Sequence, residues 1–146
     1  MCGISGYIGS KKLSNKIISQ TLNVMENRGP DHQGYKKMRF GENFIYLLSS
    51  RLKIVDRNDR SNQPMTEDDL TIIFNGEIYN IEEVKKIIQN YGLKLKTKSD
   101  TELILIMYKI FGTNCVNYFE GMWAFLIFDE KKQIVFISRD RMGEKP

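Results

Sequence analysis

A cysteine stands directly behind the initiator methionine of this chain, in the stretch MCGISG. Removal of Met1 would give Cys2 a free α-amino group, whose ordinary pKa of about 7.7–8.0 lets it act as a general base toward the thiol of the same residue. Nucleophilic catalysis at Cys2 would then need no histidine. The competing interpretation, from residue type alone, is a small apolar filler at the start of a buried strand.

Conventional cysteine catalysis has little support elsewhere in the chain. His32 is the only histidine, and it stands in the Gly- and Pro-containing stretch RGPDHQG (28–34), which we expect to be a surface loop. Cys115 has no nucleophile-elbow motif around it and is expected in the core. Two cysteines and one histidine form neither a disulfide framework nor a CxxC or HExxH motif. The sequence therefore predicts reduced thiols and no metal site.

Other polar residues follow apolar runs and could bind a substrate. Arg51 comes after FIYLLSS, and its planar guanidinium could bind a carboxylate through two hydrogen bonds, although a surface cation is the alternative. Asn75 and Gly76 come after LTIIF, where an amide NH₂ and a glycine N–H would suit an oxyanion hole; Asn-Gly is also a common turn dipeptide. Asp100, at an expected helix start, could bind an ammonium group or stabilise the helix N-terminus.

Apolar periodicity predicts a mixture of helices and strands. Asn80 with Glu83, and Ser99 with Glu102, match the capping-box signature of a helix start. Strands are expected at 3–9, on both sides of a turn at 41–42, at 70–80, and in a hairpin of 122–129 and 133–140; helices are expected from residue 13, at 81–92 and at 100–112. The nearly continuous apolar strands favour sheets covered on both faces, and therefore a layered α and β architecture.

Composition limits the class of protein further. The chain has 146 residues, 41% hydrophobic and 27% charged, which is typical of one globular domain. Its net charge of +4 comes from lysines spread in pairs without interleaved aromatic residues, so we expect no nucleic-acid partner. The chain contains no secretory signal pattern and no run of 18 apolar residues, so we expect no membrane partner and a cytoplasmic location.

These motifs resemble the N-terminal glutaminase domain of glutamine-hydrolysing asparagine synthetases, which is an Ntn-type (class II) glutamine amidotransferase. The matching stretches, in family order, are MCGISGYIG, NRGPDHQG, SRLKIVD with NQPM, FNGEIYN, KSDTELI, EGMWAFLIFD and SRDRMGEKP. NGEIYN and RDRMGEKP favour this branch over the related glutaminases of glutamine phosphoribosylpyrophosphate amidotransferase and glucosamine-phosphate synthase. One departure is Asn27, where the family usually has histidine.

The resemblance implies an α+β fold, the four-layer αββα sandwich of Ntn hydrolases. It also implies hydrolysis of the glutamine side-chain amide to glutamate and ammonia through a γ-glutamyl thioester. Cys2 would be the nucleophile and, through its amine, the base, and Asn75 and Gly76 would form the oxyanion hole. The residues implied to bind L-glutamine are Arg51 at the α-carboxylate, Glu77 and Asp100 near the α-ammonium, and the main chain of Leu52, Ile54 and Val55. No metal or cofactor is implied for this domain.

The resemblance also concerns what would follow residue 146. Family members continue with further strand and then with an ATP-binding synthetase domain that carries an SGGxDS loop. We therefore expect residues 1–146 to be one glutaminase domain, a fragment of a longer chain, whose sandwich lacks its last strands. The C-terminal synthetase domain would be its partner, would bind ATP and Mg, and would use the ammonia to make asparagine.

Two alternatives remain open at this stage. The same glutaminase could serve the amidation of a sugar or another carboxylate in surface-polysaccharide biosynthesis. The chain could instead be a catalytically inactive binding or assembly module, because Met1 is retained or because strands are missing. A homodimer is compatible with each of these hypotheses.

Overall fold

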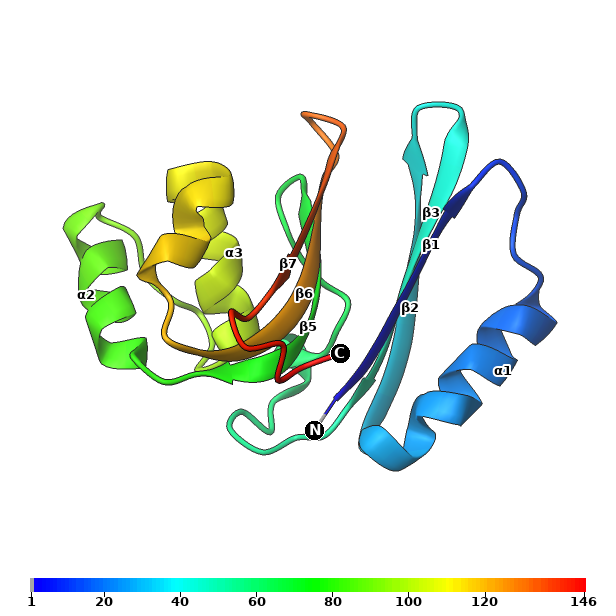
Figure 1. Ribbon diagram of the computed structural model, residues 1–146, viewed down its shortest axis with the longest axis horizontal. Coiled ribbons are helices and arrows are strands. Elements are labelled where there is room, and N and C mark those ends of the chain that lie inside the picture. The colour runs from blue at the N-terminus through cyan, green and yellow to red at the C-terminus, as the bar shows by residue number, and fades with distance from the viewer. Residues whose placement is uncertain (1) are drawn as a thin grey trace.

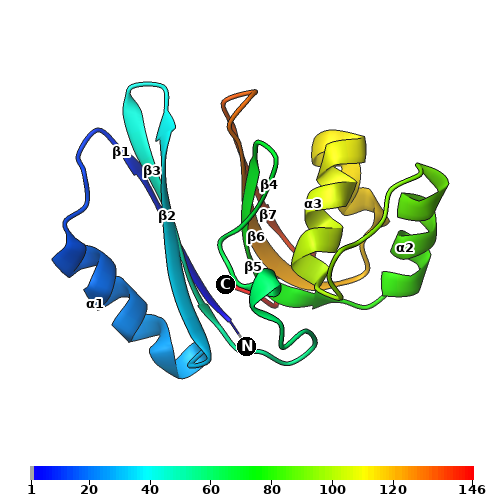
Figure 2. The same cartoon turned by 180° about the vertical axis from the view of Figure 1, so that it is seen from behind.

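Two antiparallel sheets face each other in the computed structural model, which describes residues 2–146, and helices cover the outer face of each sheet (Figures 1 and 2). The strand order is β1-β3-β2 in the first sheet and β4-β5-β6-β7 in the second. The helix α1 (Asn15–Met25) covers the first sheet, whereas α2 (Ile81–Asn90) and α3 (Asp100–Phe111) cover the second (Figure 1). The α+β class and the four-layer αββα sandwich expected from the sequence are both confirmed.

The first sheet contains β1 (Gly3–Gly9), β2 (His32–Phe40) and β3 (Asn43–Arg51), and α1 (Asn15–Met25) covers it. Successive side chains of the central strand β3 point to opposite faces, as in any strand. Tyr46 and Leu48 pack against α1, whereas Ile45 and Leu47 pack against the second sheet. Alternation in a strand that is buried on both faces explains why its sequence reads as one continuous apolar run.

The second sheet contains β4 (Met65–Glu67), β5 (Leu70–Ile78), β6 (Gly121–Asp129) and β7 (Ile134–Arg139). Its outer face packs against α2 (Ile81–Asn90) and α3 (Asp100–Phe111), where the largest apolar cluster lies. A smaller cluster fills the space between the sheets and includes Ile73, Leu126 and Phe128. No helix within residues 2–146 is long and apolar enough to cross a membrane.

The predicted elements differ from the structure at one expected loop and at several short elements. The expected loop at 28–34 is partly wrong, because β2 already begins at His32 and pairs there with Arg51 of β3. The short strand β4 and the 3₁₀ turns (η1, Glu26–Arg28; η2, Asp59–Ser61; η3, Gly112–Tyr118) carry no clear period in the sequence and were not predicted. These short elements are held by neighbouring strands and helices rather than by their own residue pattern.

The two predicted capping boxes are also wrong in detail. The Asn80 side chain does not cap α2; its amide donates a hydrogen bond to the carbonyl of Tyr118 (3.0 Å). Ser99 does cap α3, but the Glu102 carboxylate accepts hydrogen bonds from the backbone N–H groups of residues 96–97 (2.7 and 2.6 Å). In both cases a contact with a neighbouring segment replaces the local bond.

Candidate active site

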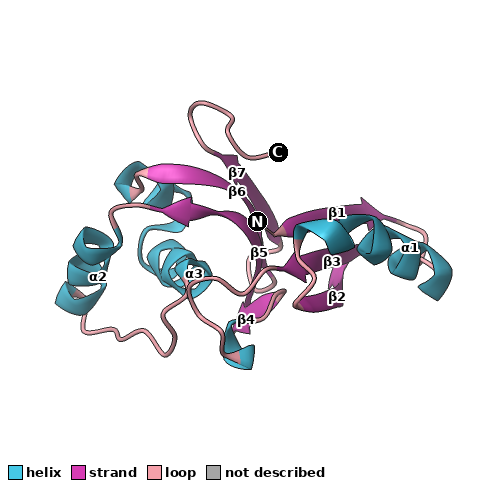
Figure 3. Cartoon of the chain, turned by 90° about the horizontal axis from the view of Figure 1, so that it is seen from below, coloured by secondary structure: helices cyan, strands magenta, loops and turns pink. Residues whose placement is uncertain are grey.

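One cavity of about 140 Å³ collects every site residue expected from the sequence. It opens at the end of the sandwich where β1 begins, and in Figures 1 and 3 that end of β1 faces the second sheet. The expected residues that line it are Cys2, Arg51, Leu52, Ile54, Val55, Asn75, Gly76, Glu77 and Asp100. The cavity is smaller than the roughly 300–1,000 Å³ pockets of drug-sized ligands, so it suits a small solute.

Cys2 directly precedes β1, and its thiol is free and partly exposed. The Nε of Arg28 donates a hydrogen bond to the Cys2 carbonyl oxygen (3.3 Å). Gly3 leaves no space for a side chain, because an added Cβ would lie 2.9 Å from the Cβ of Met25. The end of α1 therefore fixes the backbone on both sides of the Cys2 carbonyl. The expected removal of Met1 concerns a residue outside those that the structure describes.

The remaining cysteine and the histidine do not reach the cavity. Cys115 is fully buried, as predicted, and burial raises the pKa of its thiol to about 12, so it is a poor nucleophile at neutral pH. Burial, followed by the charges of Lys53 and Arg51, lowers the pKa of His32 and favours the neutral imidazole. A conventional Cys-His pair is therefore not formed by these residues.

Arg51 is the last residue of β3 and is buried. Its Nη1 donates hydrogen bonds to the Asn58 carbonyl (3.2 Å) and to Oδ1 of Asn62 (2.9 Å), and its Nη2 donates to the Asp56 carbonyl. Burial lowers the pKa of Arg51, and the charges of Cys2 and Asp56 oppose this shift. Within residues 2–146 no carboxylate forms an ion pair with Arg51. Since buried charges are normally paired, this guanidinium is suited to an anionic ligand.

Asn75 and Gly76 lie inside β5, opposite Ala124 and Trp123 of β6. The Asn-Gly turn considered from the sequence is therefore wrong. A Cβ at Gly76 would lie 2.2 Å from the carbonyl oxygen of Met122, so the close approach of the strands requires glycine. The side-chain oxygen of Asn75 is buried and, within the described residues, has no hydrogen-bond partner.

Asp100 is the first residue of α3, and its carboxylate is buried. Oδ2 accepts a hydrogen bond from the Ile78 N–H (3.0 Å), whereas Oδ1 is buried without a partner in the part of the chain that the structure describes. Burial raises the pKa of Asp100, and the charge of Glu77 adds to this rise. Two carboxylates with an unsatisfied oxygen form a site that an ammonium group would complete.

Residues 52–55 form an apolar rim beside Arg51. Ile54 and Val55 are largely exposed although both have apolar side chains, and the Ile54 N–H donates to the Leu52 carbonyl (3.2 Å). The rim places apolar side chains and main-chain groups next to the buried cation.

The cavity also contains residues to which the sequence reasoning gave no role. Gln63 donates from Nε2 to the Thr101 hydroxyl (3.1 Å), and its Oε1 accepts from the Phe74 N–H (2.7 Å), so it joins β5 to α3 beside the cavity. Asp56 and Lys145 line the cavity as well. All of these residues stand inside the stretches SRLKIVD, NQPM, FNGEIYN, KSDTELI and SRDRMGEKP, so the motifs contained the signal, but spacing alone did not give the contacts.

Asp140 holds the segment that carries Lys145. Its carboxylate accepts hydrogen bonds from four backbone N–H groups, those of Trp123, Met142, Glu144 and Lys145, at 2.9–3.1 Å. Burial alone would raise the pKa of Asp140, but these donors keep it below its usual value. The four bonds fold residues 140–145 into a tight turn at the cavity edge.

No group of three or more His, Cys, Asp or Glu side chains within the described residues is arranged to hold a metal ion. The cavity offers binding and nucleophilic groups from the protein itself: the partly exposed thiol of Cys2, the buried cations of Arg51 and Lys145, and the carboxylates of Asp56, Glu77 and Asp100.

The αββα sandwich is the fold of Ntn-type hydrolases. The chain belongs to the glutamine amidotransferase domain family, whose pattern it matches over residues 1–146. The predicted resemblance to the glutaminase domain of asparagine synthetase-like enzymes is thereby confirmed. The fold resembles that of glutamine phosphoribosylpyrophosphate amidotransferase from B. subtilis in complex with ADP and GMP, with a TM-score of 0.54 and 22% identity over 73% of this chain and 25% of that one.

Several full-length proteins resemble this chain in sequence. A putative glutamine-hydrolysing asparagine synthetase 2 of Methanocaldococcus jannaschii is 40% identical over 100% of this chain and 31% of that protein. Asparagine synthetase 3 of Bacillus subtilis is 35% identical over 100% of this chain and 24% of that protein. Amidase chry2 of Gibberella zeae is 30% identical over 99% of this chain and 23% of that protein. The chain thus spans less than a third of the length of these relatives.

Proposed function

We propose that this chain hydrolyses the side-chain amide of L-glutamine to glutamate and ammonia through a thioester at Cys2. The observation that carries the proposal is the meeting of Cys2, Arg51 and Asp100 in one small cavity. A buried guanidinium without a carboxylate partner fits the α-carboxylate of an amino acid, and the unpartnered Asp100 oxygen fits its α-ammonium. Cys2, Arg51 and Asp100 are far apart in the sequence, so their meeting in one cavity supports a shared function.

The proposed reaction proceeds in two steps. The amine of Cys2 takes the thiol proton, the sulfur attacks the amide carbon, and the side-chain NH₂ of Asn75 and the N–H of Gly76 stabilise the oxyanion. The amine returns the proton to the leaving nitrogen, and ammonia departs. Water then attacks the thioester, which releases glutamate and regenerates the thiol. Each oxyanion donor typically contributes about 2.7–4 kcal/mol to transition-state stabilisation.

The fate of the ammonia is a further part of the proposal. Full-length relatives are named asparagine synthetases and are more than three times as long as this chain, so we propose that a following synthetase domain uses ATP and Mg to make asparagine. One relative is named an amidase rather than an asparagine synthetase, so a sugar or another carboxylate is the second candidate acceptor of the ammonia. Release of asparagine or of another amide by the protein as its gene encodes it would separate these acceptors.

Substitution of the nucleophile tests the hydrolysis. Cys2→Ala should abolish release of glutamate from glutamine, while Cys115→Ala, which changes the other thiol, should leave it within about twofold once the folded fraction is matched. Intact-mass measurement of the wild-type protein should show that Met1 is absent. Turnover by Cys2→Ala would contradict the nucleophile assignment, and a folded, Met1-free protein without turnover would support the alternative of a binding or assembly module.

A further inference from the structure

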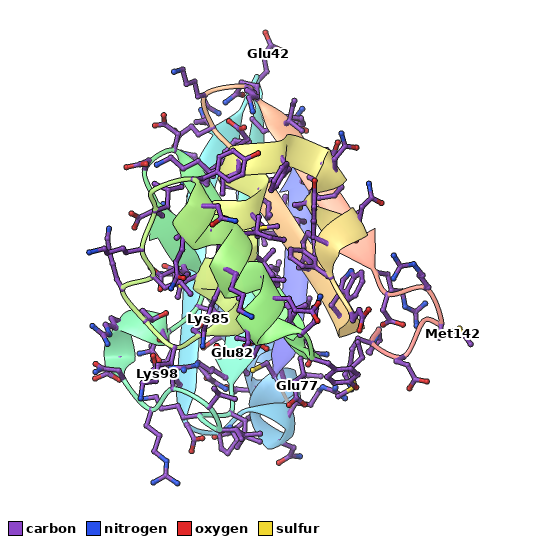
Figure 4. The ribbon with its side chains drawn as sticks, turned by 90° about the vertical axis from the view of Figure 1, so that its left-hand side faces the viewer. Glu42, Glu77, Glu82, Lys85, Lys98 and Met142 are labelled. Atoms are coloured by element: carbon purple, nitrogen blue, oxygen red, sulfur yellow. The ribbon has the colours of Figure 1, made fainter. Side chains whose placement is uncertain are left out.

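Asp56 joins two segments that both contribute residues to the cavity lining, the 52–62 loop and the 96–99 segment. Its carboxylate accepts three hydrogen bonds, two of them from its own loop: the backbone N–H of Asn58 (2.9 Å) and the hydroxyl of Ser61 (2.8 Å). The third donor is the backbone N–H of Lys98 (2.9 Å), which is 42 residues away in the sequence. In Figure 4, Lys98 lies at the same end of the molecule as Glu77 and opposite Glu42.

The backbone of Asp56 contacts the arginine of the site. The Nη2 of Arg51 donates to the Asp56 carbonyl, and its Nη1 is held by Asn58 and Asn62 of the same loop. The 52–62 loop therefore fixes the guanidinium through its carbonyl and amide oxygens. A change in the position of this loop would move the group proposed to bind the α-carboxylate.

The side chain of Asp56 contacts the segment that leads to Asp100. Residues 96–99 run directly into α3, and Glu102 holds them from the other side through the N–H groups of residues 96–97. Among residues 2–146, the bond from Lys98 to Asp56 is the one hydrogen bond between the 52–62 loop and the 96–99 segment. Asp56 therefore links the carboxylate-binding and the ammonium-binding sides at the 96–99 segment, while Gln63, next to the loop, bonds to Thr101 inside α3.

We propose that Asp56 is a positioning residue that sets the spacing of Arg51 and Asp100, and so selects amino acids that carry an α-carboxylate and an α-ammonium. This inference rests on the proposed glutaminase function. Asp56 itself does not contact the reacting amide in the proposed mechanism. Its loss should weaken recognition of the two α-groups while leaving the chemistry at Cys2, Asn75 and Gly76 intact.

The charge of Asp56 is well suited to this role. The N–H groups of Lys98 and then Asn58 lower the pKa of Asp56 to about 2, although burial opposes them. The carboxylate is therefore ionised throughout the neutral range, and hydrogen bonds to an ionised acceptor are stronger than those to a neutral one. An amide at this position would offer one acceptor oxygen for three donors.

Kinetics of two matched variants test the proposal in the protein as its gene encodes it. Asp56→Asn should raise KM for glutamine about tenfold or more and change kcat by less than about threefold. Asp59→Asn removes the same charge from the same loop, but Asp59 is exposed and contacts Lys53 (2.6 Å) and the Asn62 amide (3.2 Å) through one oxygen, which asparagine keeps, so both constants should stay within about twofold. Ser61→Ala removes one donor to Asp56 and should raise KM by a smaller factor.

A second measurement does not depend on turnover. Alkylation of Cys2 by iodoacetamide should proceed at the wild-type rate in Asp56→Asn, but L-glutamate should protect Cys2 only at about tenfold higher concentration. Unchanged KM and protection, an equal effect of Asp59→Asn, or loss of the fold in both Asp56→Asn and Ser61→Ala would overturn the role of Asp56. A wild-type protein without glutamine turnover would contradict the proposed function instead.

Discussion

The Oδ2 atom of Asp100 accepts a hydrogen bond from the backbone N–H of Ile78 at 3.0 Å, which ties the first residue of α3 to the last residue of β5. The second carboxylate oxygen of Asp100 remains buried and, in the described part of the chain, without a partner. Oδ2 therefore contributes a hydrogen bond to the fold, whereas Oδ1 is a buried acceptor without a donor among the described residues. A buried carboxylate with an unpartnered oxygen lowers the stability of the folded state, so removal of its charge should make the protein more stable.

Asp100→Asn should therefore increase the thermal stability of the protein at pH 7 and weaken its activity. Because burial raises the pKa of Asp100 above its unfolded value, the ionised group destabilises the fold at neutral pH. The difference in melting temperature between wild type and variant should shrink as the pH falls through the raised pKa and past 3.8, because below 3.8 the wild-type carboxyl is mostly protonated in both states. Melting curves between pH 3.5 and 8, at intervals of about half a unit, check this.

The same variant should raise KM for glutamine by about 10–100-fold, since a hydrogen bond to a charged group contributes about 1.5–3 kcal/mol. Glu82→Gln is the control: it removes an exposed helix carboxylate, paired with Lys85, that does not line the cavity. An Asp100→Asn protein with lower stability at pH 7 than wild type would contradict the account of its buried charge.

Arg51→Lys should weaken glutamine binding, because a lysine ammonium cannot form the paired hydrogen bonds of a guanidinium with a carboxylate. It would also leave some of the Asn58, Asn62 and Asp56 oxygens without a donor. We expect KM to rise about 10–100-fold and the free energy of unfolding to fall by about 1–3 kcal/mol. Steady-state kinetics and urea denaturation measure the two effects. Arg57→Lys, at an exposed position of the same loop, should change neither, and an equal loss in both variants would argue against a specific clamp.

Regular elements could be predicted from the sequence because their residues repeat with the period of the element. The apolar runs FIYLLSS and MWAFLIFD predicted the strands β3 and β6. Gly112 correctly predicted the end of α3. Five residues of the site were proposed from residue type and position and four only from the resemblance to the family, and the structure brings all nine of them to one cavity. Their individual roles remain predictions until they are measured.

Contacts made across the chain could not be predicted in this way. Asn80 has the residue type of a helix cap, yet its amide bonds to Tyr118, which only the folded chain brings near. Glu102 bonds to residues 96–97, just before the helix, rather than to the backbone of the capping residue. The link from Asp56 to Lys98 has the same origin, because the conformation of an irregular loop decides where its carboxylate points. Local sequence rules predict which helix-cap hydrogen bonds a residue can form. They do not predict whether the tertiary structure offers that residue a different partner.

Gly76→Ala should destabilise the second sheet at its centre. The added Cβ would lie 2.2 Å from the Met122 carbonyl oxygen, which is backbone and cannot rotate away. We expect a loss of about 1–3 kcal/mol in unfolding free energy and a loss of glutaminase activity as the β5 backbone moves. Gly6→Ala is the matched control, because its Cβ would meet Leu126 at an ordinary 3.6 Å; it should cost less than about 1 kcal/mol. Equal costs would contradict the close approach of β5 and β6.

Asp140→Asn should loosen the turn at residues 140–145 without unfolding the sandwich. The asparagine keeps one acceptor oxygen and loses the charge that four N–H groups surround. Because the pKa of Asp140 is held below its usual value, its contribution to stability is present above pH 3.8 and is lost as the pH falls through the lower folded value. Hydrogen exchange at the amides of Met142, Glu144 and Lys145 should therefore accelerate in the variant at pH 7, and the difference from wild type should narrow in acid. Glu144→Gln removes an exposed charge from the same turn and should leave these amides protected. Equal exchange in Asp140→Asn and wild type would show that other contacts hold the turn, and Lys145 would then stay beside the cavity without Asp140.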